Sequence, residues 1–302
     1  NYLIRSLALH KSLQTHCPDF HLWMLCMDNE SYSMIEKLNL ENVTAISLSE
    51  FEDEKLLQVK DSRTPVEYCW TISSSLPLYI FKKTDIDMLA YVDADLYFYS
   101  SPEIIYDEFG SNSVMIIPHR FFENIEKQEK NSGIYNVGML IFRNNEEGLT
   151  CLNWWRERCL EWCFNRIEDG KLGDQAYLND WPVRFKGVCV LANHGANVAP
   201  WNSQRYSFFS KNGSIWCKNN ETQKEFPLIF YHFHSTTLYL ILGKVKTIAG
   251  KHRPNETIIY KRYQDGLSKA YKNMCVKTKP QSFKYGFIPA YLYFWRKIKN
   301  LL

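Results

Sequence analysis

The chain has 302 residues, of which 45% are hydrophobic and 23% are charged; this composition excludes a disordered protein because it supplies a large core. No apolar run approaches the roughly 18 residues that cross a membrane, so we expect no membrane-spanning helix. Residues 244–302 hold 14 lysines and arginines against two acids, a net charge of +12, whereas residues 1–243 hold 22 against 31, a net charge of −9.

Helix and strand patterns alternate along most of the chain, which predicts a mixed, mostly parallel α/β sheet flanked by helices. The spacing of apolar residues predicts helices over Tyr2 to His16, Tyr32 to Leu38, Val66 to Lys82 (interrupted or bent near Pro77) and Gly148 to Arg166. Short apolar runs predict strands over Phe20 to Met27, Val43 to Leu48, Met88 to Val92, Val114 to Ile117, Gly138 to Phe142 and Leu228 to Phe233. Since a helical pattern already begins at Tyr2, we expect that the first strand of the sheet is missing.

The nine cysteines are an odd number with no Cys-x-x-Cys pair, which favours free thiols in a reducing compartment and a cytoplasmic protein. Cys159 and Cys163 lie four residues apart on a predicted helix, where we interpret them as core residues and not as metal ligands. Five Asn-x-Ser/Thr sequons, of which Asn42-Val43-Thr44 is one, leave a secretory-pathway protein as an alternative.

Two carboxylates, Asp93 and Asp95, follow the apolar run Met88 to Val92 directly. The carboxyl ends of strands are where open α/β sheets bind ligands, and carboxylate oxygens are ligands for hard divalent cations. An Asp-x-Asp alone is often a solvated turn, but here apolar residues on both sides would desolvate the acids unless a cation or hydrogen bonds compensate. The pattern therefore predicts a metal site.

Two further polar clusters lie at the ends of predicted elements. Asp174 and Gln175 follow the tryptophan-rich helix, and His232 and His234 lie at the end of the last predicted strand. Histidine is a good ligand for Mn²⁺ beside carboxylates, although a single histidine is more often a hydrogen-bonded core residue. The three clusters together favour one composite site.

Five short motifs follow one another along the chain: Tyr91-Val92-Asp93-Ala94-Asp95, Tyr135-Asn136-Val137-Gly138, Asp174-Gln175 with Leu178-Asn179, Trp201-Asn202, and His232-Phe233-His234-Ser235. In order and spacing this set resembles the nucleotide-sugar glycosyltransferases of family 8 and their bacterial relatives. The resemblance implies a GT-A (Rossmann-like) fold over residues 1–243. Residues 244–302 are not covered by these motifs, and we expect them to form a separate basic, helical extension.

The resemblance also implies roles for individual residues. Asp93, Asp95 and His232 would hold Mn²⁺ or Mg²⁺, which grips the diphosphate of a sugar nucleotide. Asn136 would bind the donor, and Asp174 and Gln175 would be the catalytic residues beside the donor sugar. The acceptor would be bound by His119, Arg120, Asn197, Trp201 and Asn202.

The chain departs from the family at the diphosphate. The family usually carries a lysine a few residues after the metal histidine, but here the first cation after His232 is Lys244. Arg63 and Lys60 are the candidates that would replace it.

The C-terminal segment combines aromatic residues from Phe287 to Leu302 at helical spacing with Arg296, Lys297 and Lys299. Such a helix suits the headgroups of an anionic membrane, so we expect peripheral contact with the cytoplasmic face of a bacterial membrane. Packing of the same aromatic residues on the body of the protein is the alternative. Nucleic-acid binding is not expected, because no known module accompanies the charge.

Taken together, the sequence predicts a metal-dependent, retaining glycosyltransferase that transfers a sugar, most simply from a UDP-hexose, to a cell-surface glycan or lipid-linked acceptor. A nucleotidyltransferase that makes sugar nucleotides would share the fold. A degenerate transferase that only binds a glycan or a partner is the non-enzymatic alternative, which the missing lysine favours.

Overall fold

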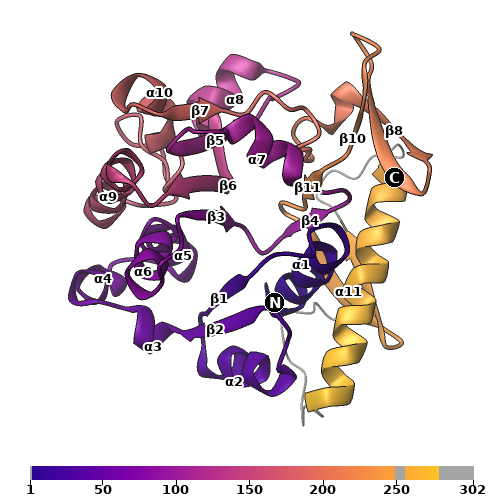
Figure 1. Cartoon of the computed structure of the whole chain (residues 1–302), viewed down its shortest axis with the longest axis horizontal. Helices are drawn as coiled ribbons and strands as arrows, with labels where there is room; N and C mark the ends of the chain where they lie inside the picture. The colour runs from indigo at the N-terminus through magenta and orange to yellow at the C-terminus, as the bar shows by residue number, and fades with distance from the viewer. Residues whose placement is uncertain (1, 249–255, 279–302) are drawn as a thin grey trace. The chain divides into compact units, whose positions relative to one another are not determined.

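The computed structural model describes residues 2–248 and 256–278, and contacts along the chain divide them into two units (Figure 1). The described residues of Asn1–Ile46, Ala94–Pro102 and His194–Leu302 form the first unit. Ser47–Asp93 and Glu103–Asn193 form the second. The chain therefore passes between the units more than once, and one passage falls between Asp93 and Ala94.

The second unit contains a four-stranded sheet in the order β3-β6-β5-β7. Its strands are β3 (Met88–Val92), β6 (Tyr135–Arg143), β5 (Val114–Pro118) and β7 (Val188–Val190). Strands β3 and β5 both pair antiparallel with β6, and β7 pairs parallel with β5. The expected mixed sheet is confirmed, but two of its three pairings are antiparallel because β6 lies between two strands that run opposite to it.

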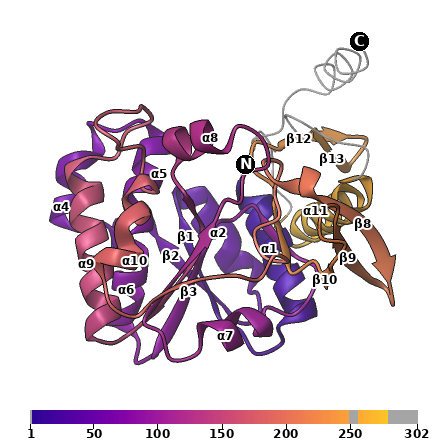
Figure 2. The same ribbon diagram turned by 90° about the horizontal axis from the view of Figure 1, so that it is seen from above.

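Helices accompany this sheet, as the alternating pattern predicted. They are α3 (Leu48–Phe51), α4 (Glu54–Lys60), α5 (Pro65–Ser73), α6 (Ser75–Lys83), α7 (Glu103–Phe109), α8 (Ile125–Ser132), α9 (Glu146–Glu161) and α10 (Trp181–Arg184), with a 3₁₀ turn at Ala176–Asp180. Helix α9 packs on β5 and β6 and is grouped with α4, α5 and α6 (Figure 2). The predicted interruption of the helix from Val66 to Lys82 is present, but it lies at Ser74, where α5 ends and α6 begins, and not at Pro77. Pro77 fits into the first turn of α6, where its missing N–H costs no helical hydrogen bond.

Trp155 is the centre of the core of the second unit. It is fully buried and contacts Phe142 of β6 and Trp181 of α10 with ring centroids 6.2 and 5.7 Å apart. Its neighbour Trp154 is only partly buried.

We expect Trp155→Ala to lower the free energy of unfolding by about 3 to 5 kcal/mol, because it leaves a large cavity that the sheet cannot fill. Urea denaturation followed by tryptophan fluorescence and circular dichroism measures this loss. Trp154→Ala is the matched control on the same helix, and it should cost clearly less. Equal losses for the two variants would contradict the placement of the core.

The described residues of the first unit form α1 (Tyr2–His16), α2 (Asn29–Leu38), α11 (Thr257–Thr278) and four small sheets. Three of these sheets have two strands each: β1 (Leu22–Cys26) with β2 (Val43–Ser47), β4 (Leu96–Phe98) with β11 (Phe230–His232), and β12 (Thr237–Ile241) with β13 (Lys244–Ile248). The fourth sheet has three strands, β8 (Tyr206–Lys211), β9 (Ser214–Asn219) and β10 (Glu225–Pro227), with β9 in the middle. A 3₁₀ turn over Ser203–Arg205 precedes β8.

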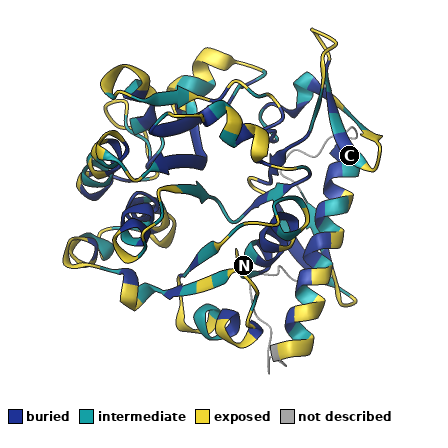
Figure 3. Cartoon of the chain, viewed as in Figure 1, coloured by how far each residue is buried: buried dark blue, intermediate teal, exposed yellow. Residues whose placement is uncertain are grey.

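Helix α1 packs against α11 and against β4, and α11 also contacts α2 and β13. Buried residues of these elements, among them Leu7, Ile35 and Tyr263, form one apolar core. Figure 3 shows the corresponding buried side of α11 beside its exposed side. The predicted bounds of the first helix, Tyr2 to His16, are confirmed.

The C-terminal part of the chain begins inside this unit. Gly243, where the sequence suggested a boundary, lies in the turn between β12 and β13. The amphipathic pattern from Phe287 to Leu302 lies outside the described residues. Within residues 2–248 and 256–278, no helix is both long enough and apolar enough to span a bilayer.

Candidate functional site

The short pair of strands β4 and β11 positions Asp95 and His232. The two strands are antiparallel, with Leu96 opposite His232, and the backbone N–H of Phe233 donates to the Asp95 carbonyl at 2.9 Å. The N–H of His232 donates to the Val198 carbonyl at 2.8 Å. Backbone hydrogen bonds on both sides of the two residues therefore fix where their side chains begin.

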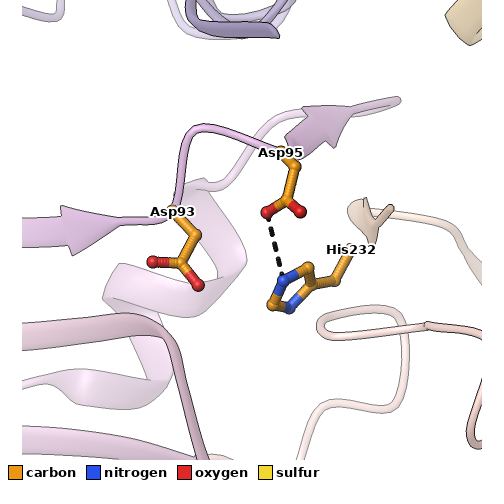
Figure 4. A group of neighbouring side chains, drawn as sticks. All are labelled: Asp93, Asp95 and His232. Atoms are coloured by element: carbon orange, nitrogen blue, oxygen red, sulfur yellow. Dashed lines mark ion pairs between the residues drawn. The ribbon is translucent and has the colours of Figure 1, made fainter. Parts of the chain in front are cut away.

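Asp93, Asp95 and His232 each offer one ligand atom, and these atoms all lie within 4.8 Å of one another (Figure 4). Asp93 is the last residue of the second unit and is joined to Ala94 by a peptide bond, while Asp95 and His232 belong to the first unit. His232 Nε2 lies 3.2 Å from Asp95 Oδ1, and both residues are buried. Two carboxylates and one imidazole suit Mn²⁺ or Mg²⁺, and a buried carboxylate needs such compensation. The residues therefore fit a divalent cation.

The charges around Asp95 keep it ionised. Burial alone would raise the pKa of Asp95, but the adjacent His232, and with smaller effects Arg5 and His234, bring that pKa below its ordinary value. Burial and the neighbouring His232 lower the pKa of His234. The ring of Trp201 meets the rings of His232 and His234 edge-on, with centroids 5.3 and 5.7 Å away. Asp95 is therefore available as a charged ligand at neutral pH.

A second acidic residue, Asp174, lies in the second unit and is 6% exposed. Burial, and next the charge of Asp93, raise the pKa of Asp174 to about 8. Asp93 itself accepts a hydrogen bond from the Tyr91 hydroxyl at 3.0 Å, and Trp155 Nε1 donates to the Asp174 carbonyl at 2.8 Å. At neutral pH and without a cation, Asp174 therefore holds a proton for most of the time.

Asn136, Gln175 and His119 are brought together in the second unit. Asn136 Nδ2 lies 3.4 Å from Gln175 Oε1 and 3.3 Å from His119 Nε2, and Gln175 Nε2 donates to the Ser132 carbonyl at 2.6 Å. The expected donor residue, one expected catalytic residue and one expected acceptor residue thus share one hydrogen-bonded group.

The other expected acceptor residues are partly occupied by their own loops. Arg120, at φ +53°, donates to the Leu191 carbonyl at 2.6 Å. In the first unit, Asn202 accepts from the Ala199 N–H and donates to the Asn197 carbonyl, both at 2.9 Å, and both asparagines are buried. Asn202 therefore shapes the loop that carries Trp201, and its role toward an acceptor stays a prediction.

The two cations expected to replace the family lysine have partners within the second unit. Lys60 Nζ lies 2.6 Å from Glu52, and the Arg63 guanidinium lies 3.9 Å from the centre of the Phe164 ring and donates to the Leu160 carbonyl. A buried cation that the sequence reasoning missed is Arg5, whose charge acts on Asp95. The signal was a single charged residue among Ile4, Leu7 and Ala8 on an apolar helix face.

Two bacterial proteins are similar to this chain over most of its length. It is 32% identical over 279 residues to the uncharacterised protein YfnF of Bacillus subtilis, covering 90% of each chain. It is 35% identical over 240 residues to the uncharacterised protein YfnD of the same organism, covering 78% of this chain and 75% of that one. No family model matches the chain.

Three solved structures to which the chain is similar are glycosyltransferases by their own descriptions. The galactosyltransferase LgtC, in complex with donor and acceptor sugar analogs, aligns with a TM-score of 0.49 and 17% identity over 89% of this chain and 92% of its own. Mouse xyloside xylosyltransferase 1 aligns with a TM-score of 0.46 and 13% identity, over 78% of this chain and 93% of its own. A glycosyltransferase involved in glycosylation of the major capsid of PBCV-1 aligns with a TM-score of 0.43 and 8% identity, over 88% of this chain and 93% of its own.

Proposed function

The chain belongs to the family of the Bacillus subtilis proteins YfnF and YfnD, and we propose that it is a metal-dependent, retaining glycosyltransferase of the GT-A type. Its donor is a nucleoside-diphosphate sugar, most simply a UDP-hexose. Its acceptor is a cell-surface glycan or a lipid-linked saccharide. It acts in the cytoplasm, at the inner face of the membrane.

The observation that carries this proposal is the group formed by Asp93, Asp95 and His232. His232 lies 137 residues after Asp95 in the sequence, yet the two side chains are 3.2 Å apart and both are buried. Burying a carboxylate and an imidazole at the end of two short strands costs desolvation free energy, which a favourable interaction at this place has to offset. A divalent cation would provide such an interaction. Its ligands would be the three residues that the resemblance of the five sequence motifs implies.

The residues of the chain divide the chemistry between them. Asp93, Asp95 and His232 would hold Mn²⁺ or Mg²⁺, and the ion, when bound, would stabilise negative charge on the departing diphosphate. Asn136 and Gln175 would orient hydroxyl groups of the donor sugar through amide groups that already hydrogen-bond each other. Asp174 would lie beside the reacting carbon, and its raised pKa allows it to hold or release a proton near neutral pH.

A degenerate protein that binds a glycan without transferring a sugar is the second candidate. The specific observation in its favour is that residues 235–243 contain no cation and that Lys60 and Arg63 are engaged with Glu52 and Phe164. A diphosphate would then lack the lysine that the resembled family usually provides after the metal histidine.

A thermal-shift screen tests the proposed function. We expect one of UDP, GDP, CDP and dTDP, or its sugar derivative, to raise the melting temperature in Mn²⁺ and not in EDTA, because a ligand that binds only the folded state stabilises it. Release of the nucleotide from the sugar form in Mn²⁺ would then separate a transferase from a binding protein. The absence of a Mn²⁺-dependent shift with every nucleotide would overturn the proposal.

A further inference from the structure

Arg5 is a charged residue on the buried face of helix α1. Arg5 is only 4% exposed, and its neighbours on this face, Ile4 and Ala8, are core residues of the first unit. Arginine is almost never buried in this way unless its charge is paired and its five N–H groups are satisfied. The partners of Arg5 therefore need to be accounted for.

The hydrogen bonds of Arg5 are incomplete. Nη2 donates to the backbone carbonyl of Thr236, but Nε and Nη1 are buried and find no hydrogen-bond partner among residues 2–248 and 256–278. Leaving buried charged N–H groups unsatisfied is costly, so such groups point to a missing acceptor.

Arg5 lies in the same structural neighbourhood as Asp95 and His232. Thr236, which accepts from Arg5, donates its own N–H to the Phe233 carbonyl at 3.2 Å, and Phe233 donates to the Asp95 carbonyl. Arg5 also acts electrostatically on Asp95, whose pKa it helps to lower. All of these residues belong to the first unit, so the guanidinium and the ligands Asp95 and His232 are held by one body.

The Tyr263 hydroxyl is a further polar group at this place. Burial raises the pKa of Tyr263, and the nearby Arg5 charge opposes that rise. This hydroxyl is buried beside Arg5, and apart from that neighbour no described residue forms a hydrogen bond with it. Within residues 2–248 and 256–278, Nε and Nη1 of Arg5 therefore lack a full set of acceptors, and the Tyr263 hydroxyl is the polar side chain beside them.

We propose that Arg5 is the residue that binds the diphosphate of the donor, in place of the lysine expected after His232. The inference rests on the proposed function. Phosphate oxygens are strong acceptors for guanidinium N–H groups, and a diphosphate on a cation held by Asp95 and His232 would present such oxygens beside Arg5. The competing interpretation is that Arg5 only neutralises Asp95, and the two interpretations differ in what the loss of Arg5 does to metal binding.

The experiment compares Arg5→Met and Arg5→Lys with the parent chain. Lys11→Met is the matched control, because Lys11 is an exposed cation on the same helix. Mn²⁺ binding is measured alone, from the electron paramagnetic resonance signal of the free ion. Calorimetry at saturating Mn²⁺ then measures binding of the best nucleoside diphosphate among UDP, GDP, CDP and dTDP, and thermal melting without ligands checks the fold.

We expect Arg5→Met to bind the diphosphate about 10 to 100 times more weakly, since it loses charge-assisted hydrogen bonds. Mn²⁺ alone should bind as tightly or more tightly, because a positive charge beside Asp95 is gone. Lys11→Met should match the parent chain in both measurements. If Arg5→Met does not fold, Arg5→Lys carries the test, and it should bind the diphosphate more weakly than the parent with Mn²⁺ binding unchanged.

Three results would overturn the inference. Unchanged diphosphate affinity in the folded Arg5 variants means that Arg5 does not contact the diphosphate. Equal losses of Mn²⁺ and diphosphate binding mean that Arg5 is only a structural countercharge. A parent chain that binds Mn²⁺ but no diphosphate removes the proposed function itself, and the inference with it.

Discussion

Asp95→Asn is expected to reduce sugar transfer by at least about 1000-fold and to abolish the Mn²⁺ dependence of nucleotide binding. The substitution removes one negative charge from the three candidate ligands and leaves the shape of the side chain unchanged. Because an asparagine oxygen can still accept from His232 Nε2, which lies 3.2 Å from Asp95 Oδ1, the first unit should remain folded. Transfer is measured as nucleotide released from the donor identified by thermal shift.

The control for this variant is Asp265→Asn, which removes an exposed carboxylate from α11 in the same unit. It should transfer sugar at the rate of the parent chain. Circular dichroism and melting in EDTA establish that both variants are folded. If Asp95→Asn retained Mn²⁺-dependent transfer, Asp95 would not be a metal ligand and the proposed site would be wrong.

Asp174→Asn is expected to make the protein more stable at pH 8 and to abolish transfer. The pKa of Asp174 is about 8 in the folded protein, well above the value of about 3.9 of an unfolded aspartate. Between these two values the folded state holds a proton that the unfolded state has lost, so the contribution of Asp174 to stability falls as the pH rises from 4 to 8. Asparagine cannot ionise, and the variant therefore escapes this loss.

Melting in EDTA across pH 4 to 9 measures the effect. The melting temperature of Asp174→Asn should be near that of the parent at pH 4 and about 5 °C or more above it at pH 8. Asp107→Asn, which changes an exposed carboxylate of α7, should follow the parent at every pH. A melting difference that does not grow with pH would contradict the raised pKa of Asp174. Full transfer activity in a stabilised variant would remove Asp174 from the catalytic residues.

Local features of the fold and site were predictable from the sequence. The first helix was predicted with its observed bounds, Tyr2 to His16, because apolar side chains recur at helical spacing throughout it. Asp93 and Asp95 were found because acids directly after an apolar strand are costly without a partner. His232 was added through the resemblance of the motifs, and the three do lie together.

Features that depend on long-range packing were not predictable. The three-stranded sheet of Tyr206–Lys211, Ser214–Asn219 and Glu225–Pro227 has too many polar residues to read as a set of strands. Lys60 and Arg63 were chosen by charge and position, but which cation meets which acid or ring depends on tertiary contacts. Arg5 was overlooked because a single charge in a helical pattern reads as a surface residue, and only the packing of α1 reveals its burial.

The pairing of β4 with β11 also bears on how the protein folds. Each strand has three residues, and more than 130 residues separate them in the sequence. Closing the long intervening loop costs chain entropy, and such a short pair of strands gains few hydrogen bonds to offset that cost. The pair should therefore form late in folding, after other elements of its unit are in place. During synthesis, His232 can contact Asp95 only after β11 has left the ribosome. The group of Asp93, Asp95 and His232 would then be among the last parts of the protein to form.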